Sequence, residues 1–434
     1  MINRIILIGN GFDLAHEMKT SYNSFISNYW SKIDYTLSQS RNMHFSSEDF
    51  NVTYTYRYVP GDIFNVAKNS TNFLSREYIE NGRFDTSHKI LEIHNNFIFQ
   101  ISEKSFDNWV DIENEYYEIL LDLIPNNSNR EGGINKINQE LKRIKDELKI
   151  YLEGVQDNFT HSNKIIDHIK NIIDEPIKME DLSEEAKKKI YKEKWEMFKN
   201  VALNEYEDKN ILGDFYDDPF DKFLYSILSK GVWSETSFYT LLKIHDEKFF
   251  NERLDIVDLI SFNYTSTERA YEGFVNFNAI HIHGELNNED NPLIFGYGDE
   301  LDDSYLEIEK LKNDAYLDNM KSINYSKTNN YKRVLSILES GMFQVYIMGH
   351  SCGNSDRTLL NTIFEHENCA SIKLFYYQDS LNTDRYLDTY KNISRNFNSK
   401  TKLRDRVVNW QQSQPLVPFT LKQEVLYDFK NSKK

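Results

Sequence analysis

The stretch that decides the fold reads Arg4-Ile5-Ile6-Leu7-Ile8-Gly9-Asn10-Gly11-Phe12-Asp13. Its first half is a short apolar run rich in isoleucine, which is typical of a strand buried on both faces of a parallel sheet. The two glycines indicate a turn, and Leu14, Ala15 and Met18 then fall at roughly helical spacing. The segment therefore predicts a strand, a glycine turn and a helix, in that order.

The glycine turn has two interpretations that the sequence alone leaves open. Glycine lets a backbone turn sharply and approach a phosphate, and the helix that follows offers free amides to an anion. On this interpretation we expect a nucleotide to be lined by Gly9, Asn10, Gly11, Phe12 and Asp13. The fingerprint of hydride-transferring dinucleotide enzymes is incomplete, because leucine stands at position 14 in place of the third glycine. A plain structural turn explains the same letters.

Composition excludes several classes of protein. The 434 residues include 51 Lys and Arg against 68 Asp and Glu, a formal net charge of −17. A negative surface repels phosphates, so nucleic acid is disfavoured as a partner. Two cysteines, Cys352 and Cys369, cannot form a disulfide framework or a four-thiolate zinc site. No apolar run approaches the ~20 residues of a membrane span, so we expect a soluble cytoplasmic protein without membrane contact.

The hydrophobic pattern changes twice along the chain. Residues 85–249 are rich in charged, amphipathic helical patterns, and short β-like runs return at 257–262, 279–283, 293–295, 344–348 and 372–377. We therefore predict an α/β domain with a parallel sheet, made of residues 1–84 and 250–434 and interrupted by a helical insertion at 85–249. One apolar stripe at helical spacing is expected to pack against the domain: Ile134, Ile137, Leu141, Ile144, Leu148 and Val155.

Two motifs stand at predicted strand ends, where ligands bind in open α/β sheets. Asn263 can orient a ribose hydroxyl or a water through its amide, or it can simply cap the next helix. His281 and His283 alternate with isoleucines, which places both on one face of a strand. His283 is a candidate general base, and the pair is also a candidate metal site that would need His350, Asp356 or Glu285. Two hydrogen-bonded structural histidines remain the alternative.

A third strand end carries Gly349-His350-Ser351-Cys352-Gly353, which matches the nucleophile elbow of serine hydrolases. That fold places its acid and its histidine after the serine, yet the only later histidine is His366, inside the next predicted helix. The order of residues excludes this hydrolase. We instead expect Ser351 and Asp356 to reach a bound ribose or phosphate.

An acidic motif begins the helical region, at Trp109-Val110-Asp111-Ile112-Glu113-Asn114-Glu115. On a helix, Asp111 and Glu115 share one side because they lie four residues apart. Such carboxylates could stabilise a cationic transition state or hold a metal. A solvated acidic face accounts for the same pattern.

Several of these patches together resemble the bacteriophage abortive-infection AbiH family. The resemblance covers most of the chain in islands, in the expected order: Gly9 to His16 with Thr20-Ser21-Tyr22 and Phe25, Trp109 to Glu113, Ser261 to Thr265, His281 to Gly284, and Gly349 to Ser351 with Asp356. Residues 125–245 and 380–434 add little, and Glu17-Met18 departs from the Gly-Leu pair of many relatives. The family implies antiphage defence in a bacterium without supplying a molecular activity.

The same order of islands is similar to sirtuin-like NAD-consuming domains, which implies a Rossmann-like fold and NAD as substrate or ligand. By that resemblance Asn263 would position the ribose or the attacking water, and His283 would act as the base. Gly9, Gly11, Ser351 and Asp356 would line the nucleotide. Sirtuin deacetylases carry four zinc-binding cysteines, which two cysteines cannot replace. Hydrolysis of the cofactor is therefore the better expectation than protein deacylation.

Three functional hypotheses follow. The first is an enzyme of antiphage defence that hydrolyses the N-glycosidic bond of NAD or a related nucleotide, assisted by Asp13, Asp111 or Glu113. The second is a metal-dependent hydrolase or nuclease that uses the two histidines. The third is a nucleotide sensor without turnover, with a phage or host protein as trigger, and a homo-oligomer is left open. The first requires Gly9, Asn263, His283 and Ser351 to converge on one dinucleotide-sized cleft.

Overall fold

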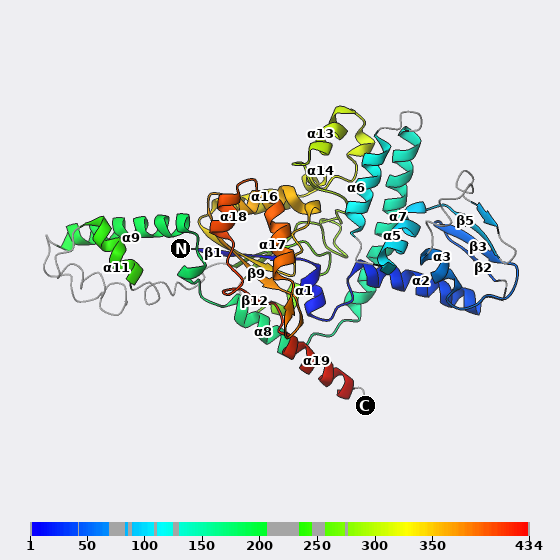
Figure 1. The fold of residues 1–434 in the computed structure, drawn as a ribbon, viewed down its shortest axis with the longest axis horizontal. Helices are drawn as coiled ribbons and strands as arrows, with labels where there is room; N and C mark the ends of the chain where they lie inside the picture. Colours follow the sequence, from blue (N-terminus) through cyan, green and yellow to red (C-terminus); the bar gives the residue numbers. More distant parts are fainter. Residues whose placement is uncertain are drawn as a thin grey trace.

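A sheet of six parallel strands forms the centre of the molecule (Figure 1). The computed structural model describes residues 2–41, 43–68, 83–85, 89–107, 111–124, 130–205, 234–244, 257–273 and 277–432. In sheet order the strands are β12 (Gln414–Pro415), β9 (Cys369–Tyr376), β8 (Phe343–Met348), β1 (Asn3–Ile8), β6 (Val257–Ser261) and β7 (Phe277–His281). Every neighbouring pair in this sheet is parallel, which confirms the predicted α/β class.

Both faces of the sheet are buried, as the apolar run of β1 predicted. Side chains alternate between faces along a strand, so Ile5 and Leu7 join one hydrophobic cluster while Ile6 and Ile8 join another. The first face is covered by α15 (Asn330–Glu339), α16 (Arg357–Phe364), α17 (Tyr386–Arg395) and α18 (Lys400–Arg406). The second is covered by α1 (Asn10–Ala15), α8 (Asn163–Ile173) and α19 (Phe419–Ser432).

The strand order is that of a Rossmann-like fold. Numbered along the chain, the six strands lie in the order 3-2-1-4-5-6 of doubly wound nucleotide-binding sheets. The connections change direction between β1 and β8, which pair directly from Asn3 with Phe343 to Ile8 with Met348. In such sheets ligands bind beyond the carboxyl ends of the strands at this switch point. The turns at Gly9 and Gly349 are therefore neighbours.

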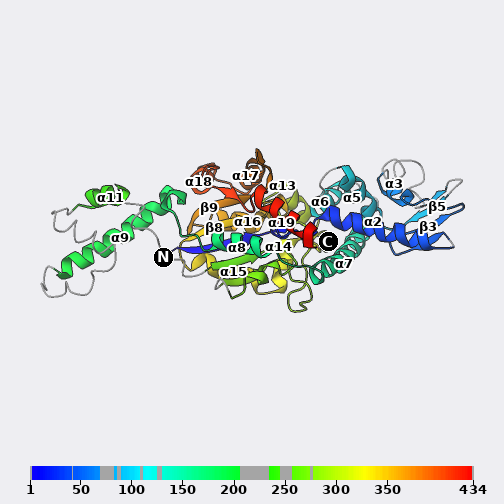
Figure 2. The same ribbon diagram turned by 90° about the horizontal axis from the view of Figure 1, so that it is seen from below.

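A large insertion separates α1 from β6 (Figures 1 and 2). It contains a four-stranded antiparallel sheet, with β2 (His44–Ser46), β3 (Phe50–Tyr54), β5 (Lys89–Ile93) and β4 (Arg83–Asp85) in that order. Four helices pack with it: α2 (Tyr22–Gln39), α3 (Asp62–Lys68), α5 (Asn96–Asp107) and α7 (Arg130–Asp157). The domain boundary between residues 84 and 85 stays a prediction. In the structure these two residues follow each other within strand β4.

The apolar stripe of α7 packs as expected. Ile134, Ile137, Leu141, Ile144 and Leu148 are all buried in the same hydrophobic cluster as α2 and α5, and Val155 packs against it. The predicted strand at 293–295 was wrong. Ile294 forms a single ladder-like hydrogen bond, from its amide to the carbonyl oxygen of His283 at 2.8 Å, so burial of Ile294 and Phe295 in an irregular segment accounts for their apolar character.

Two further helices are α9 (Glu184–Glu205) and α11 (Glu235–Ile244). They lie on the side of the central sheet that is away from the insertion (Figures 1 and 2). The remaining elements are short, and they include α6 (Ile112–Leu123), α13 (Asp303–Lys310), α14 (Lys321–Asn324), β10 (Gln378–Ser380), β11 (Thr383–Asp384), η2 (Met179–Asp181), η3 (Thr267–Tyr271), η4 (Asp314–Tyr316), η5 (Tyr325–Lys327) and η6 (Asn354–Asp356). Among the described residues, no helix combines the length and the apolar character needed to cross a lipid bilayer.

Candidate functional site

The turns after β1 and β8 pack directly on each other. The amide nitrogen of Gly11 donates to the carbonyl oxygen of Gly349 at 2.8 Å. A Cβ atom on Gly11 would lie 2.6 Å from that oxygen, and one on Gly349 would overlap the backbone nitrogen of Phe12. Gly349 also has φ of +77°, which disfavours other residues. Close packing of the two turns therefore accounts for these glycines, and the amide of Gly11 is not free for a phosphate.

Replacement of Gly349 by alanine is expected to destabilise the protein by about 2–4 kcal/mol, because overpacking adds to an unfavourable backbone conformation. The measurement is the thermal unfolding midpoint. Gly154→Ala is the matched control, since Gly154 lies in helix α7 with no atom within 4 Å of the added Cβ. It should stabilise the protein slightly. Equal midpoints for Gly349→Ala and the wild type would contradict the packing argument.

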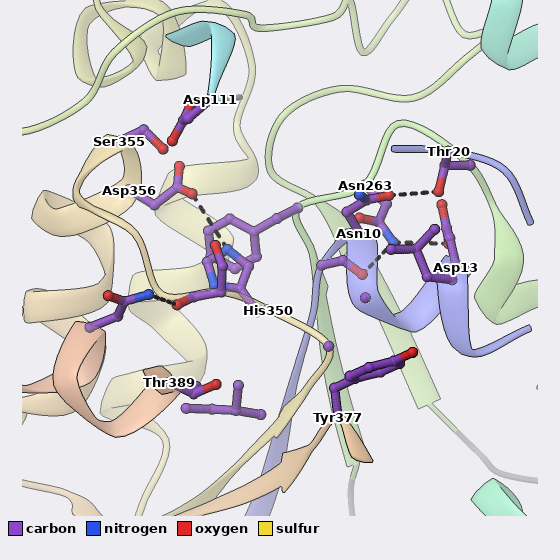
Figure 3. A pocket seen from close by; sticks show the side chains of 18 of the residues that line it. Asn10, Asp13, Thr20, Asp111, Asn263, His350, Ser355, Asp356, Tyr377 and Thr389 are labelled. Atoms are coloured by element: carbon purple, nitrogen blue, oxygen red, sulfur yellow. Dashed lines mark hydrogen bonds and ion pairs between the residues drawn. The ribbon is translucent and has the colours of Figure 1, made fainter. Parts of the chain in front are cut away.

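A cavity of about 580 Å³ opens at the carboxyl ends of the strands (Figure 3). This volume lies within the ~300–1,000 Å³ of small-molecule sites. Its walls include the turns after β1, β6 and β8, the end of β9, and α17. The insertion contributes Tyr22 from α2, Glu113 from α6, and Leu148 and Leu152 from α7. The cavity is thus enclosed by the sheet on one side and the insertion on the other.

Most of the predicted site residues meet in this cavity. It is lined by Gly9, Asn10, Gly11, Asp13, Asn263, His283, Ser351 and Asp356. Phe12 is an exception, because its ring packs in the core with centroids 4.7 Å from His16 and 5.9 Å from Tyr271. Asp111 also lines the cavity, whereas Trp109 and Val110 lie outside the described residues. The convergence of four distant motifs is therefore observed, while their chemical roles stay predictions.

Asn263 and Asp13 form a buried network that holds the first turn. The amide nitrogen of Asn263 donates to the carbonyl oxygen of Gly9 and to Asp13 Oδ1, both at 3.0 Å. Asp13 also accepts hydrogen bonds from Thr265 at 2.5 Å and from Thr267 at 2.7 Å. Burial raises the pKa of Asp13 to about 6, against these hydrogen bonds, which lower it. Asn263 therefore uses the hydrogens of its side-chain amide within the protein, where they hold the first turn.

A cluster of buried charges lies at one end of the cavity. The Lys321 ammonium donates to Glu113 Oε2 at 2.7 Å and to Asp356 Oδ1 at 2.8 Å. Only 1% of the Lys321 side chain and 9% of each carboxylate side chain are exposed. Two carboxylates therefore share one ammonium in a nearly dry environment. When both are ionised, the three groups carry one net negative charge.

Two histidines flank Asp356. His283 Nε2 lies 3.2 Å from Asp356 Oδ1, and His350 Nε2 lies 3.4 Å from Asp356 Oδ2. The amide of Cys352 donates to His350 Nδ1 at 3.0 Å, so a neutral His350 carries its hydrogen on Nε2 and directs it toward Asp356. His283 packs edge-on against Phe262, with ring centroids 5.2 Å apart. The sequence named both histidines and Asp356 as candidates, but it assigned them to a metal site or to a bound ribose or phosphate and not to contact with one another.

The environment pushes the pKa values of the two carboxyl groups apart. Burial raises the pKa of Glu113 to about 7, aided by the charge of Asp356 and opposed by Lys321. Burial acts in the same direction on Asp356, but Lys321 and His283 outweigh it and hold the pKa of Asp356 well below its usual range. Burial and the Lys321 charge lower the pKa of His283 to about 4. At neutral pH, Asp356 is therefore ionised, His283 is neutral, and Glu113 is poised to exchange a proton.

Such a pair of carboxyl groups is typical of acid–base chemistry. A group whose pKa lies near the working pH serves best as general acid or base, and a permanently ionised neighbour stabilises positive charge. Glu113 fits the first description and Asp356 fits the second. The site can therefore move a proton and stabilise a cation in the same cavity.

The two histidines at β7 do not act as a pair. Both ring nitrogens of His281 have partners elsewhere, the carbonyl oxygen of Asn263 at 3.1 Å and Glu268 Oε1 at 3.0 Å, whereas His283 faces Asp356. Within the part of the chain that the structure describes, no group of three or more His, Cys, Asp or Glu side chains is placed to hold a metal ion. The geometry therefore gives the metal-site hypothesis no support.

Sequence reasoning missed Lys321, which joins the cluster. No motif surrounds it, and it becomes visible only when the segment before α14 folds back to the cavity, with the Lys321 amide donating to the carbonyl oxygen of Tyr297 at 2.7 Å. The signal that could have pointed to it is indirect. Two buried carboxylates require a nearby cation, but a sequence with 51 basic residues offers no way to select one.

Fold and site together define a Rossmann-like α/β protein with a charged cavity at the switch point of its parallel sheet. A family model described as Bacteriophage abortive infection AbiH matches residues 5–378. The chain therefore belongs to the AbiH family, which supports a role in phage abortive-infection defence. No curated protein and no solved structure gives a significant match.

Proposed function

We propose that this protein acts in abortive infection by hydrolysing the N-glycosidic bond of NAD or a related nucleotide in the cytoplasm. The observation that carries the proposal is the buried cluster of Glu113, Lys321 and Asp356 at the end of a ligand-sized cavity. The strand order is that of doubly wound nucleotide-binding sheets, and the cavity lies beyond the carboxyl ends of the strands, where such sheets bind nucleotides. The following paragraphs derive the chemistry that these residues supply.

Cleavage of an N-glycosidic bond builds positive charge on the ribose. In the bound nucleotide the bond between ribose carbon and pyridinium nitrogen breaks, and its electron pair moves to the ring, which leaves as neutral nicotinamide. The ionised carboxylate of Asp356 stabilises the ribose cation that forms. This stabilisation is strong because the carboxylate is fixed by Lys321, His283 and His350 in a nearly water-free environment.

The attacking water must lose a proton as its oxygen bonds to the ribose carbon. Glu113 receives that proton in our proposal and later releases it to solvent, because its pKa of about 7 matches the working pH. His283, the base expected from the sequence, is a weaker candidate since burial and Lys321 lower its pKa to about 4. In our proposal His283 orients the carboxylate of Asp356, and Asn263 holds the turn after β1 in place.

The direct test is incubation of purified protein with NAD, followed by quantification of nicotinamide and ADP-ribose. Because an enzyme of this kind can be silent before infection, protein purified from phage-challenged cells is measured beside protein from unchallenged cells. We expect equimolar nicotinamide and ADP-ribose from at least one preparation. Intact NAD and intact related N-glycosides after incubation with both preparations would overturn the proposal.

The rate of nicotinamide release is expected to rise with pH through about 7, because Glu113 accepts a proton only when it is ionised. Glu113→Gln removes the base, so the rate should fall by roughly 10²–10⁴-fold and the rise near this pH should disappear. Glu118→Gln is the matched control, since Glu118 is exposed on the same helix. A Glu113→Gln profile that follows the wild-type curve would rule out this role of Glu113.

A nucleotide sensor without turnover is the second candidate. The observation in its favour is that the cavity is enclosed by both the sheet and the insertion, through Glu113, Leu148 and Leu152. A ligand there would contact both parts and couple their positions. Tight binding of NAD, measured by calorimetry, with no product after long incubation of activated protein would favour the sensor over the enzyme.

A further inference from the structure

The two ends of the cavity are lined by different residues (Figure 3). Asp111, Ser355 and Asp356 lie at one end, here called the inner end, and Tyr377 and Thr389 lie at the other, here called the outer end. Among the described residues that line the cavity, Lys321 and Arg385 supply the Lys and Arg side chains. An anionic part of a ligand that pairs with a Lys or Arg side chain of the lining therefore lies near one of these two.

Lys321 is not available to an anion. Its ammonium already lies between Glu113 and Asp356, with 1% of the side chain exposed. A phosphate at the inner end would meet the carboxylates of Asp111, Glu113 and Asp356 at short range, and like charges repel strongly in a poorly hydrated cavity. The inner end therefore accepts a cationic or neutral group.

Arg385 has the opposite properties. Its side chain is 58% exposed, and its guanidinium contacts Asp379 Oδ2 at 2.8 Å and Asp388 Oδ2 at 3.3 Å. Exposed ion pairs of this kind contribute little free energy and exchange readily. The guanidinium also donates from Nη2 to Asp379 Oδ1 at 3.3 Å, so Asp379 occupies two of its nitrogens. Asp388 makes one longer contact, and it is the partner that a phosphate oxygen can replace.

The surroundings of Arg385 contain a fixed backbone, a second cation and a polar side chain. Its backbone amide donates to the carbonyl oxygen of Tyr377 at 2.9 Å, which fixes the start of α17 beside the end of β9. Lys422 Nζ lies 3.7 Å from the centre of the Tyr377 ring and adds a second positive charge near this end. Thr389 contributes a polar side chain to the lining. Asp379 and Asp388 already pair with Arg385, so the outer end accepts an anion where the anion takes the place of one of these carboxylates.

We propose that Arg385 binds the phosphate of the nucleotide and that the phosphate replaces Asp388 as the partner of Arg385. This inference rests on the proposed function and deepens it. The substrate is a nucleotide that carries a diphosphate, not a nucleoside. Its diphosphate lies at the outer end, and its N-glycosidic bond points toward Glu113 and Asp356. Charge complementarity along the cavity thus selects the substrate class and its orientation.

The test measures binding by calorimetry with the carbocyclic analogues of NAD and of nicotinamide riboside, in which the glycosidic bond is resistant to hydrolysis. Arg385→Gln should weaken binding of the NAD analogue by roughly 10-fold or more and change binding of the riboside analogue by less than about 2-fold. Asp388→Asn should tighten binding of the NAD analogue by a few-fold, because it removes a competitor. Arg385→Lys should restore part of the lost affinity.

Arg404→Gln is the matched control, since Arg404 is exposed on α18 and does not line the cavity. It should leave both affinities unchanged. Equal affinity of the wild type and Arg385→Gln for the NAD analogue would overturn the role of Arg385 while leaving the proposed function in place. Equal losses for both analogues would also overturn it. If the wild type binds neither analogue, the proposed function and this inference both fail.

Discussion

Lys321→Met is expected to lower the free energy of unfolding by about 3–5 kcal/mol, because it leaves two buried carboxylates without their cation. Methionine has a similar length and fills the space of the lysine stem, so loss of packing contributes little. The measurement is denaturant-induced unfolding followed by circular dichroism. Lys332→Met is the matched control, since Lys332 is exposed on α15, and a surface substitution there should change stability by less than about 0.5 kcal/mol.

The dependence of this loss on pH provides a second test. Without Lys321, the folded-state pKa values of Glu113 and Asp356 lie above their unfolded values. Between the unfolded and folded pKa values the folded protein binds more protons, so its stability falls as pH rises. The loss caused by Lys321→Met should therefore be smaller at pH 5 than at pH 8. The triple variant with Glu113→Gln and Asp356→Asn should recover much of the stability at pH 8. A loss that is equal at both pH values would contradict the explanation that Lys321 stabilises the ionised carboxylates of Glu113 and Asp356.

Asp356→Asn is expected to reduce the rate of nicotinamide release by roughly 10²–10³-fold while the protein stays folded. The variant keeps the volume of the side chain but removes the charge that stabilises the ribose cation, a loss typical of one preorganised electrostatic group. The fall should appear in kcat more than in KM, because the interaction is strongest in the transition state. Lys321 keeps Glu113 as a partner in this variant, so stability should change far less than in Lys321→Met.

Asp290→Asn is the matched control for the same chemical change, since Asp290 is exposed in the loop after β7. It should retain the wild-type rate. Wild-type kcat in Asp356→Asn would exclude electrostatic stabilisation by this carboxylate. A large rise in KM with unchanged kcat would place Asp356 in ground-state binding only.

The parallel sheet and the turn at Gly9 could be predicted because their signals are local. An apolar run buried on both faces and two glycines before a helix pattern are enough to indicate β1, the turn and α1. Since the carboxyl ends of parallel strands share one edge, the motifs at Asn263, His283 and Ser351 could also be expected to meet. The cavity lining bears this out.

The rest of the site depends on contacts that no local pattern records. Lys321 meets Glu113 across 208 positions and Asp356 across 35 positions of the chain, and its neighbours in sequence give no sign of burial. Phe12 was predicted to line the nucleotide, but its side chain packs in the core. A glycine-turn motif does not specify which of its side chains face a ligand. The antiparallel sheet escaped prediction because its strands are short and half-exposed, as in His44–Ser46 and Lys89–Ile93.

The ion triad of Glu113, Lys321 and Asp356 has a thermodynamic consequence for the docking of the insertion. Glu113 belongs to α6 of the insertion, whereas Lys321 and Asp356 belong to the segments around the parallel sheet. Separation of α6 from the sheet would break the pairing of Glu113 with Lys321, so docking and pairing are linked equilibria. Linkage is reciprocal. Because burial raises the pKa of Glu113 in the docked state, protonation of Glu113 must favour docking. A molecule that favours the undocked insertion must therefore lower this pKa, by the same coupling free energy.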